Sequence, residues 1–165
     1  MKLKGKAHKF GNDVNTDYII SGRYKFKTLD MRELAQHVME DLDPDFYKKI
    51  KKGDFIVAGK NFGCGSSREQ APLAIKYAGI SGIMAKSFAR IFYRNAINVG
   101  LPVMECNTAK IKEGDELEVD LEGGIIYNKR RKKKIKFKPL LPFMIEILKD
   151  GGLAAHFKKY GTFKL

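Results

Sequence analysis

The sequence predicts an α/β fold, and two patterns support this prediction. Residues 53–105 alternate between short apolar runs, typical of buried strands, and longer amphipathic segments, typical of helices. After Cys106 the pattern changes to short segments in which polar and apolar residues alternate, as in a small antiparallel sheet. We therefore expect a mixed parallel and antiparallel sheet with flanking helices, in a single domain that spans residues 1–165.

The first part of the chain predicts a strand, a loop and a helix. Residues 2–11 alternate weakly, which suits a first strand, and residues 12–20 combine turn formers with an apolar end, which indicates a loop leading to a buried position. Residues 30–42 predict a helix with Asp30 as N-cap and Glu33 three residues later. Its apolar residues recur at helical spacing, namely Leu34, Val38 and Leu42. A second, shorter helical segment is expected after Pro44.

Three apolar runs separated by two helical segments predict the parallel core. The runs lie at residues 53–59, 82–87 and 101–105, and the helices end near Ala78 and at Gly100. Right-handed connections bring the carboxyl ends of such strands to one edge of the sheet, where binding sites form. The glycine-rich segment "GKNFGCGSSREQA" falls at that edge.

The last third of the chain predicts three antiparallel strands and two helices. The strands are expected at 115–120, 124–128 and 134–138, and the helices at 142–152 and 153–161.

The net charge of +13 is densest at residues 128–138 ("NKRRKKKIKFK"). Lysines alternate there with Ile135 and Phe137, which predicts a half-buried strand with a solvated cationic face. A nucleic-acid-binding domain would also need stacking or base-reading residues in register with this charge, and none is visible. We therefore expect no nucleic-acid partner and interpret the charge as favouring small anionic substrates or an acidic partner subunit.

Cysteine usage and hydropathy indicate a cytoplasmic protein. Cys64 and Cys106 are the two cysteines and form no Cys-x-x-Cys or Cys/His cluster, so we expect a reduced intracellular chain that binds no metal itself. The first residues contain no apolar signal segment, and no apolar run approaches the roughly 18 residues of a membrane span. We expect no membrane association.

The glycine-rich segment does not match a nucleotide-binding loop or a nucleophile elbow. Arg68 stands where a dinucleotide fingerprint has its third small residue, and neither Ser66 nor Ser67 has glycines at both flanking positions of an elbow. The three histidines, His8, His37 and His156, lie on separate predicted elements, which argues against a Ser-His dyad.

A capping box from Ser66 to Glu69 is the structural alternative, but it explains only part of the motif. Pro72 requires that the helix either begins near Gln70 or starts early and kinks. In both cases residues 66–68 lie at an exposed helix N-terminus, where an arginine and free N–H groups can hold a carboxylate. A serine in such a positive field could accept a proton once it is ionised.

Three separated segments resemble one family. "DVNTDYI", "GKNFGCGSSREQA" and "AKSFARIFYRNAINVGLP" are similar to segments of the small subunits of the 3-isopropylmalate dehydratase and homoaconitase group, equivalent to the swivelling C-terminal domain of aconitase. The resemblance implies an aconitase-like swivelling β/β/α domain that pairs with a large subunit carrying a 4Fe-4S cluster. The pair would be a hydro-lyase that interconverts 2-isopropylmalate and 3-isopropylmalate in leucine biosynthesis, or the related homoaconitase or 2,3-dimethylmalate dehydratase.

The resemblance also implies roles for individual residues. Ser66 matches the serine that abstracts the carbon-bound proton, and Ser67 and Arg68 match positions that hold a substrate carboxylate. Asp17 matches an aspartate of the same active site. Arg90 and Arg94 either brace the fold or bind a ligand, and Cys64 is assigned no chemistry.

Substrate selectivity in this family resides in the loop at residues 21–30, where the candidates are Tyr24, Lys25, Phe26 and Lys27. Phe26 facing the substrate would select an alkyl group, whereas Lys27 would select a third carboxylate. The choice among isopropylmalate, homoaconitate, dimethylmalate and citraconate stays open. From other functional classes, a basic nucleic-acid-binding module and a freestanding domain without activity are the alternatives.

Overall fold

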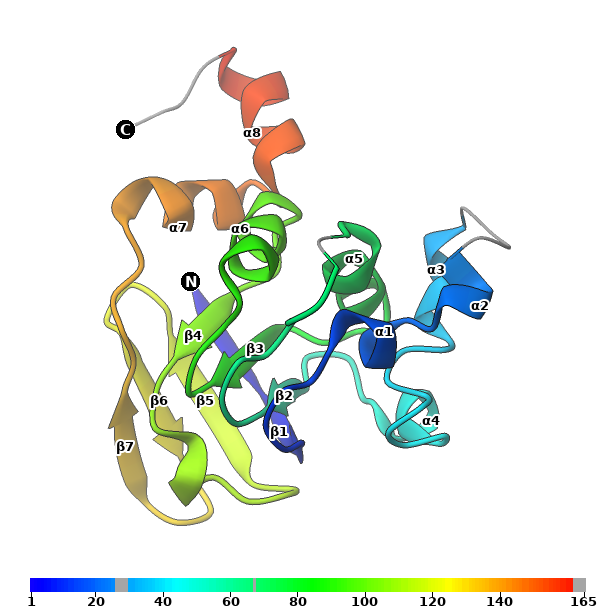
Figure 1. Ribbon diagram of the computed structural model, residues 1–165. Coiled ribbons are helices and arrows are strands. Elements are labelled where there is room, and N and C mark those ends of the chain that lie inside the picture. Colours follow the sequence, from blue (N-terminus) through cyan, green and yellow to red (C-terminus); the bar gives the residue numbers. More distant parts are fainter. Residues whose placement is uncertain (26–29, 67, 162–165) are drawn as a thin grey trace.

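The computed structural model describes residues 1–25, 30–66 and 68–161 (Figure 1). Its strands form a seven-stranded sheet in the order β4-β3-β2-β1-β5-β6-β7. They are β1 (Lys2–Lys9), β2 (Phe55–Val57), β3 (Gly82–Ala85), β4 (Val103–Glu105), β5 (Glu116–Asp120), β6 (Ile125–Asn128) and β7 (Lys133–Lys136).

Strand β1 joins two halves of this sheet. Its last residues run parallel to β2, with Ala7 opposite Phe55, and its first residues run antiparallel to β5, with Lys2 opposite Asp120. Strands β2, β3 and β4 continue the parallel half, and β5, β6 and β7 the antiparallel half. The predicted mixed sheet is confirmed, and the antiparallel strands are continuous with the parallel core.

Helices connect the parallel strands and cover the sheet. In the chain, α5 (Gln70–Tyr77) follows β2 and α6 (Arg90–Asn98) follows β3. Helix α6 lies between α5 and α7 (Pro142–Lys149), and α8 (Leu153–Tyr160) follows α7 (Figure 1). The shorter helices are α1 (Thr16–Ile19), α2 (Gly22–Lys25), α3 (Met31–Ala35), α4 (Phe46–Lys49) and the 3₁₀ turn η1 (Thr108–Lys110).

The burial of the strands differs between the two halves of the sheet. Every residue of β2 and β3 is buried, as expected of parallel strands that are covered on both faces. In β7, at the edge of the sheet, Ile135 is buried and the three lysines are exposed. The predicted cationic, solvated strand face is confirmed, and lysines at an edge also discourage pairing with other chains.

The helix predicted over residues 30–42 is shorter than expected. Asp30 is its N-cap and accepts a backbone hydrogen bond at 2.9 Å, but α3 ends at Ala35. Turns follow, in which Met39 has a φ of +57° and donates its N–H to the carbonyl oxygen of Ile19 at 2.9 Å. A positive φ cannot continue a right-handed helix, so this tertiary contact overrides the helical spacing of the side chains.

The loop predicted over residues 12–20 ends in a helical turn. Residues Thr16–Ile19 form α1, and the carboxamide oxygen of Asn15 caps it by accepting the N–H of Asp17 at 2.8 Å. The apolar end of this segment is buried, as expected, because Ile19 and Ile20 are both fully covered.

Candidate active site

A cavity of about 200 Å³ lies beside the glycine-rich segment, beyond the carboxyl ends of β2 and β3. Ser66 and Arg68 line one part of it, and Arg90 and Phe92 line another part from the first turn of α6. The remaining lining residues are Thr16, Gly63, Gly65, Ala89 and Ile91. Segments far apart in the sequence therefore meet at the edge of the sheet where a site was predicted.

The chain around α1 holds the glycine-rich segment on one side. The N–H of Gly63 donates to the carbonyl oxygen of Val14 at 2.8 Å, and the N–H of Thr16 donates to that of Cys64 at 2.8 Å. The hydroxyl of Thr16 donates to the carbonyl oxygen of Ser66 at 2.9 Å. These bonds fix the backbone of Ser66 beside α1.

The residues that precede α6 hold the same segment on its other side. The N–H of Phe62 donates to the carbonyl oxygen of Ser87, and the N–H of Ala89 donates to that of Phe62, both at 3.0 Å. Phe62 and Cys64 thus form parallel bridges to the segments on either side. The three sequence motifs that carry the family resemblance lie next to one another.

At two positions of the segment only glycine fits, because a Cβ atom would clash with a neighbouring side chain. Gly63 has a φ of +83°, and a Cβ there would lie 2.2 Å from Cγ of Phe92. Gly65 has a φ of +96°, and a Cβ there would lie 2.5 Å from Oδ1 of Asn15. The glycines therefore let the segment pack closely against α6 and the start of α1.

The alternative of a capping box between Ser66 and Glu69 is excluded, because Glu69 and not Ser66 is the N-cap of the helix. Helix α5 begins at Gln70 with Glu69 as its N-cap, so Pro72 falls in the first turn, where proline is tolerated. Of the two alternatives, the helix that begins near Gln70 is correct. Ser66 is held by Thr16 before the helix starts and remains exposed at the cavity wall.

Helix α6 adds positive potential to the cavity. It begins at Arg90, and its N-cap residue Ala89 makes no side-chain capping bond. The first N–H groups of a helix have no partner within the helix and carry the positive end of its dipole. Together with the guanidinium groups of Arg68 and Arg90, they make this cavity suited to a carboxylate. The same positive field favours an ionised Ser66 hydroxyl.

Asp17 lies next to the cavity without lining it. It follows Thr16 in α1 and is exposed. Ser67, predicted to bind the substrate carboxylate together with Arg68, lies outside the described residues.

Of the loop at residues 21–30 that was predicted to set selectivity, the structure describes residues 21–25 and Asp30. Tyr24 in α2 stacks on His37, with ring centroids 3.7 Å apart and 5° between the planes. Lys25 is the last residue of α2, whereas Phe26 and Lys27 lie outside the described residues. The stack fixes Tyr24 against the turn that follows α3.

Sequence reasoning missed four lining residues, Thr16, Ala89, Ile91 and Phe92, and left Arg90 undecided. Thr16 was not singled out, although it stands beside the predicted Asp17, and Phe92 was read only as part of a helix. Arg90 lines the cavity, whereas Arg94, one turn later, lines a larger groove. The signal for Arg90 was its position at a helix start that follows a parallel strand.

The chain's own residues do not fit a 4Fe-4S cluster. A 4Fe-4S cluster is typically held by four cysteine thiolates, whereas this sequence has two cysteines, Cys64 and Cys106. Within residues 1–25, 30–66 and 68–161, no three His, Cys, Asp or Glu side chains gather closely enough to hold a metal ion. No helix in those ranges is both long and apolar enough to cross a membrane.

Comparisons with known proteins agree with the geometry. The aconitase C-terminal domain family matches residues 13–108. The 3-isopropylmalate dehydratase small subunit 2 of Archaeoglobus fulgidus is 59% identical over 100% of both chains, and small subunit 1 of Thermotoga maritima is 54% identical over 98% of both. The isopropylmalate/citramalate isomerase small subunit of Methanocaldococcus jannaschii is 58% identical over 95% of this chain and 94% of its own.

A solved structure confirms the fold. The crystal structure of 3-isopropylmalate dehydratase from Methanocaldococcus jannaschii superposes with a TM-score of 0.94 and 55% identity, over 98% of this chain and 96% of that one. The aconitase-like swivelling fold expected from the sequence is thereby confirmed. The chain belongs to the aconitase C-terminal domain family, among the small subunits of 3-isopropylmalate dehydratase.

Proposed function

We propose that this chain is the small subunit of a hydro-lyase that interconverts 2-isopropylmalate and 3-isopropylmalate in leucine biosynthesis. One observation carries the proposal: Ser66, Arg68 and the start of α6 line one cavity, in a chain that is 54–59% identical to small subunits of that name. The cavity supplies a hydroxyl and a carboxylate site, which are two of the parts that such a reaction needs.

Ser66 is the proposed proton acceptor. The reaction removes a proton from one carbon and a hydroxyl group from its neighbour, which leaves an alkene, and then returns water with the positions exchanged. Ionised Ser66 takes the carbon-bound proton and later returns it. The dipole of α6 and the nearby arginines stabilise the alkoxide in its working position.

Arg68 is the proposed carboxylate ligand. Its guanidinium can bind a substrate carboxylate through two parallel hydrogen bonds, and Ser67 adds a hydroxyl donor in the proposed arrangement. Asp17 is placed at the end of the bound substrate nearest α1. Arg90, on the facing wall, supports the same anion.

A large subunit completes the proposed enzyme. The relatives are named small subunits, and the two cysteines here are too few to hold a cluster. We therefore assign the 4Fe-4S cluster, a Lewis acid that would polarise the leaving hydroxyl group, to the large subunit. The assembled enzyme is proposed to be cytoplasmic, and neither nucleic acid nor membrane has a part in its reaction.

Citramalate isomerisation is the second candidate. The relative from Methanocaldococcus jannaschii is named an isopropylmalate/citramalate isomerase small subunit. Both substrates carry two carboxylates and an alkyl group, so one cavity can serve them. Homoaconitate and dimethylmalate remain alternatives, and the selectivity residues Tyr24, Lys25, Phe26 and Lys27 decide among these substrates in this proposal.

Reconstitution tests the proposal. The chain is combined anaerobically with the large subunit from its own source, and isopropylmalate, citramalate, citraconate, homoaconitate and dimethylmalate are assayed side by side. We expect the highest kcat/KM with isopropylmalate. A reconstituted complex that turns over homoaconitate and not isopropylmalate would replace the proposed substrate. A complex inactive on all five would refute the proposed function.

A further inference from the structure

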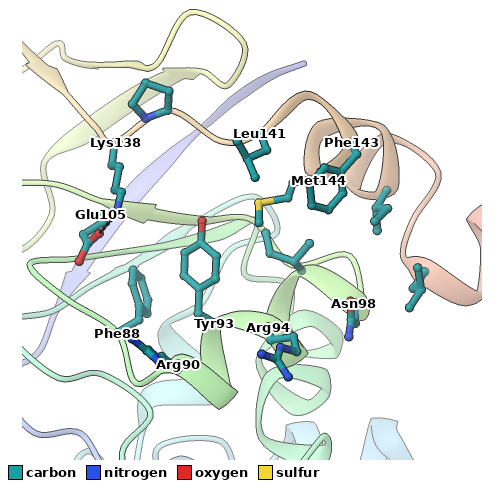
Figure 2. A pocket seen from close by; sticks show the side chains of 14 residues that line it. Phe88, Arg90, Tyr93, Arg94, Asn98, Glu105, Lys138, Leu141, Phe143 and Met144 are labelled. Carbon is teal, nitrogen blue, oxygen red and sulfur yellow. Dashed lines mark ion pairs between the residues drawn. The ribbon is translucent and has the colours of Figure 1, made fainter. Parts of the chain in front are cut away.

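A groove of about 780 Å³ lies between α6 and α7. Its apolar lining comes mainly from these helices and α8, and includes Tyr93, Ile97, Leu141, Phe143, Met144, Ile147 and Leu153. In Figure 2, Tyr93 rises from α6 into the groove, and Met144 and Phe143 of α7 face it. The groove is distinct from the cavity beside Ser66.

The groove has a cationic rim that this chain neutralises only in part. Arg90, Arg94 and Lys138 stand along it, and Lys138 pairs with Glu105 at 3.8 Å (Figure 2). Among the described residues, Arg90 and Arg94 have no carboxylate partner. They lie one helical turn apart, where like charges repel, and Arg90 also opposes the helix dipole. Such unfavourable electrostatic interactions are expected where a ligand or a partner protein supplies the opposite charge.

The groove adjoins the candidate active site. Arg90 lines both cavities. Two strongly exposed apolar side chains flank this face: Ile91 at the Ser66 cavity is 52% exposed, and Leu141 at the groove is 53% exposed. Apolar surface of this kind, rimmed by charge, marks protein interfaces.

We propose that the groove between α6 and α7 is the docking site of the large subunit, which would insert an apolar side chain flanked by carboxylates that pair with Arg90 and Arg94. The inference rests on the proposed function, because the Ser66 cavity supplies only half of that chemistry and the partner must cover it. A partner that covers the cavity extends over Arg90 and into the groove.

Charge reversal at Arg94 and a charge at Leu141 test this proposal. Both side chains are exposed and lie outside the Ser66 cavity, so Arg94→Glu and Leu141→Asp leave the fold and that cavity intact. Affinity for the purified large subunit is measured by titration calorimetry. We expect each change to weaken it about tenfold or more. Added salt should weaken wild-type binding more than Arg94→Glu binding.

Matched controls come from remote surfaces. Arg130→Glu changes the same charge on the β6–β7 turn, and Leu42→Asp changes an apolar residue that is 44% exposed beyond α3. Both should bind like wild type. Unchanged affinity of Arg94→Glu and Leu141→Asp would overturn the proposal, as would a wild-type chain that does not bind the large subunit. Loss of self-association alone, seen by sedimentation, would assign the groove to a second copy.

Binding and turnover separate the two proposals. A wild-type complex that forms but is inactive on all the dicarboxylates refutes the proposed function and leaves the docking site standing. An active wild-type complex whose assembly is unaffected by both groove variants refutes the docking site alone.

Discussion

Thr16 and Ser66 are joined by a hydrogen bond of 2.9 Å from the threonine hydroxyl to the serine carbonyl oxygen, across 50 residues of sequence. Thr16 is 1% exposed, so the donor end of this bond is buried. It ties the proposed proton acceptor to α1, and α1 also carries Asp17. Thr16 is therefore a positioning residue for Ser66.

Replacement of Thr16 by valine should lower kcat more than it raises KM. The methyl group keeps the shape of the buried side chain, but the lost hydrogen bond is worth about 1 kcal/mol, which corresponds to about a fivefold change. Steady-state kinetics of the reconstituted enzyme measure the effect. Thr16→Ser keeps the hydroxyl and should restore most of kcat; equal losses in both variants would exclude the positioning role.

Removal of the Ser66 hydroxyl should nearly abolish turnover. A positioned general base contributes about 10²–10⁴-fold to the rate, so Ser66→Ala should lose about that factor in kcat. Ser66 is exposed, and its carbonyl bond to Thr16 does not involve the side chain, so folding should be unaffected. Thermal denaturation and binding to the large subunit serve as controls. Wild-type kcat in an assembled Ser66→Ala complex would remove this residue from the base role.

Substitution of Arg68 by lysine should mainly weaken substrate binding. Lysine keeps the positive charge but cannot form the two parallel hydrogen bonds of a guanidinium. We expect KM to rise about tenfold or more, with a smaller change in kcat. An isopropylmalate analogue that lacks the bound carboxylate should not distinguish the variant from wild type. If KM and kcat both stay unchanged, Arg68 is not the carboxylate ligand.

The predictions from sequence succeeded where a pattern is local. The apolar runs at β2 and β3 are fully buried and pair in parallel, so these runs identified the parallel core and the edge where the candidate site lies. The alternating lysines of β7 likewise gave its exposed face. Asp30 could be predicted as an N-cap because its side chain accepts a hydrogen bond from the N–H of Arg32, only two residues later.

The predictions failed where a long-range contact overrides local preference. Leu34 and Val38 have helical spacing, but the bond from Met39 to Ile19 ends the helical path. Ser66 and Glu69 have the spacing of a capping box, but the backbone of Ser66 is bound to Thr16 instead. Rules based on residue spacing do not predict such contacts, because the two bonded residues lie 20 and 50 positions apart in the sequence.

Two buried aspartates should make the fold sensitive to acid. Burial alone would raise the pKa of Asp54, but His8, which lies 2.8 Å away, and the N–H groups of Lys51 and Lys6 together lower it. The ordinary value is 3.8, and a group whose pKa is lowered by folding stabilises the fold above that value.

Asp115, in the antiparallel half of the sheet, also has a lowered pKa and also stabilises the fold near neutral pH. Burial alone would raise its pKa, but the Asn128 amide, the N–H of Lys112 and the guanidinium of Arg131 together lower it. Both carboxylates therefore contribute stability that is present near neutral pH and is lost as the pH falls through their lowered pKa values.

Chemical denaturation between pH 7 and pH 3 measures this loss. We expect the free energy of unfolding to hold near neutral pH and to fall as the pH drops below about 4, because the unfolded chain then binds protons that the folded chain does not. Asp115→Asn should lower stability at pH 7 by about 1–3 kcal/mol and flatten the acid dependence. Asp45→Asn changes an exposed carboxylate and should do neither. An acid dependence that survives in the Asp54→Asn and Asp115→Asn double variant would assign the effect to other groups.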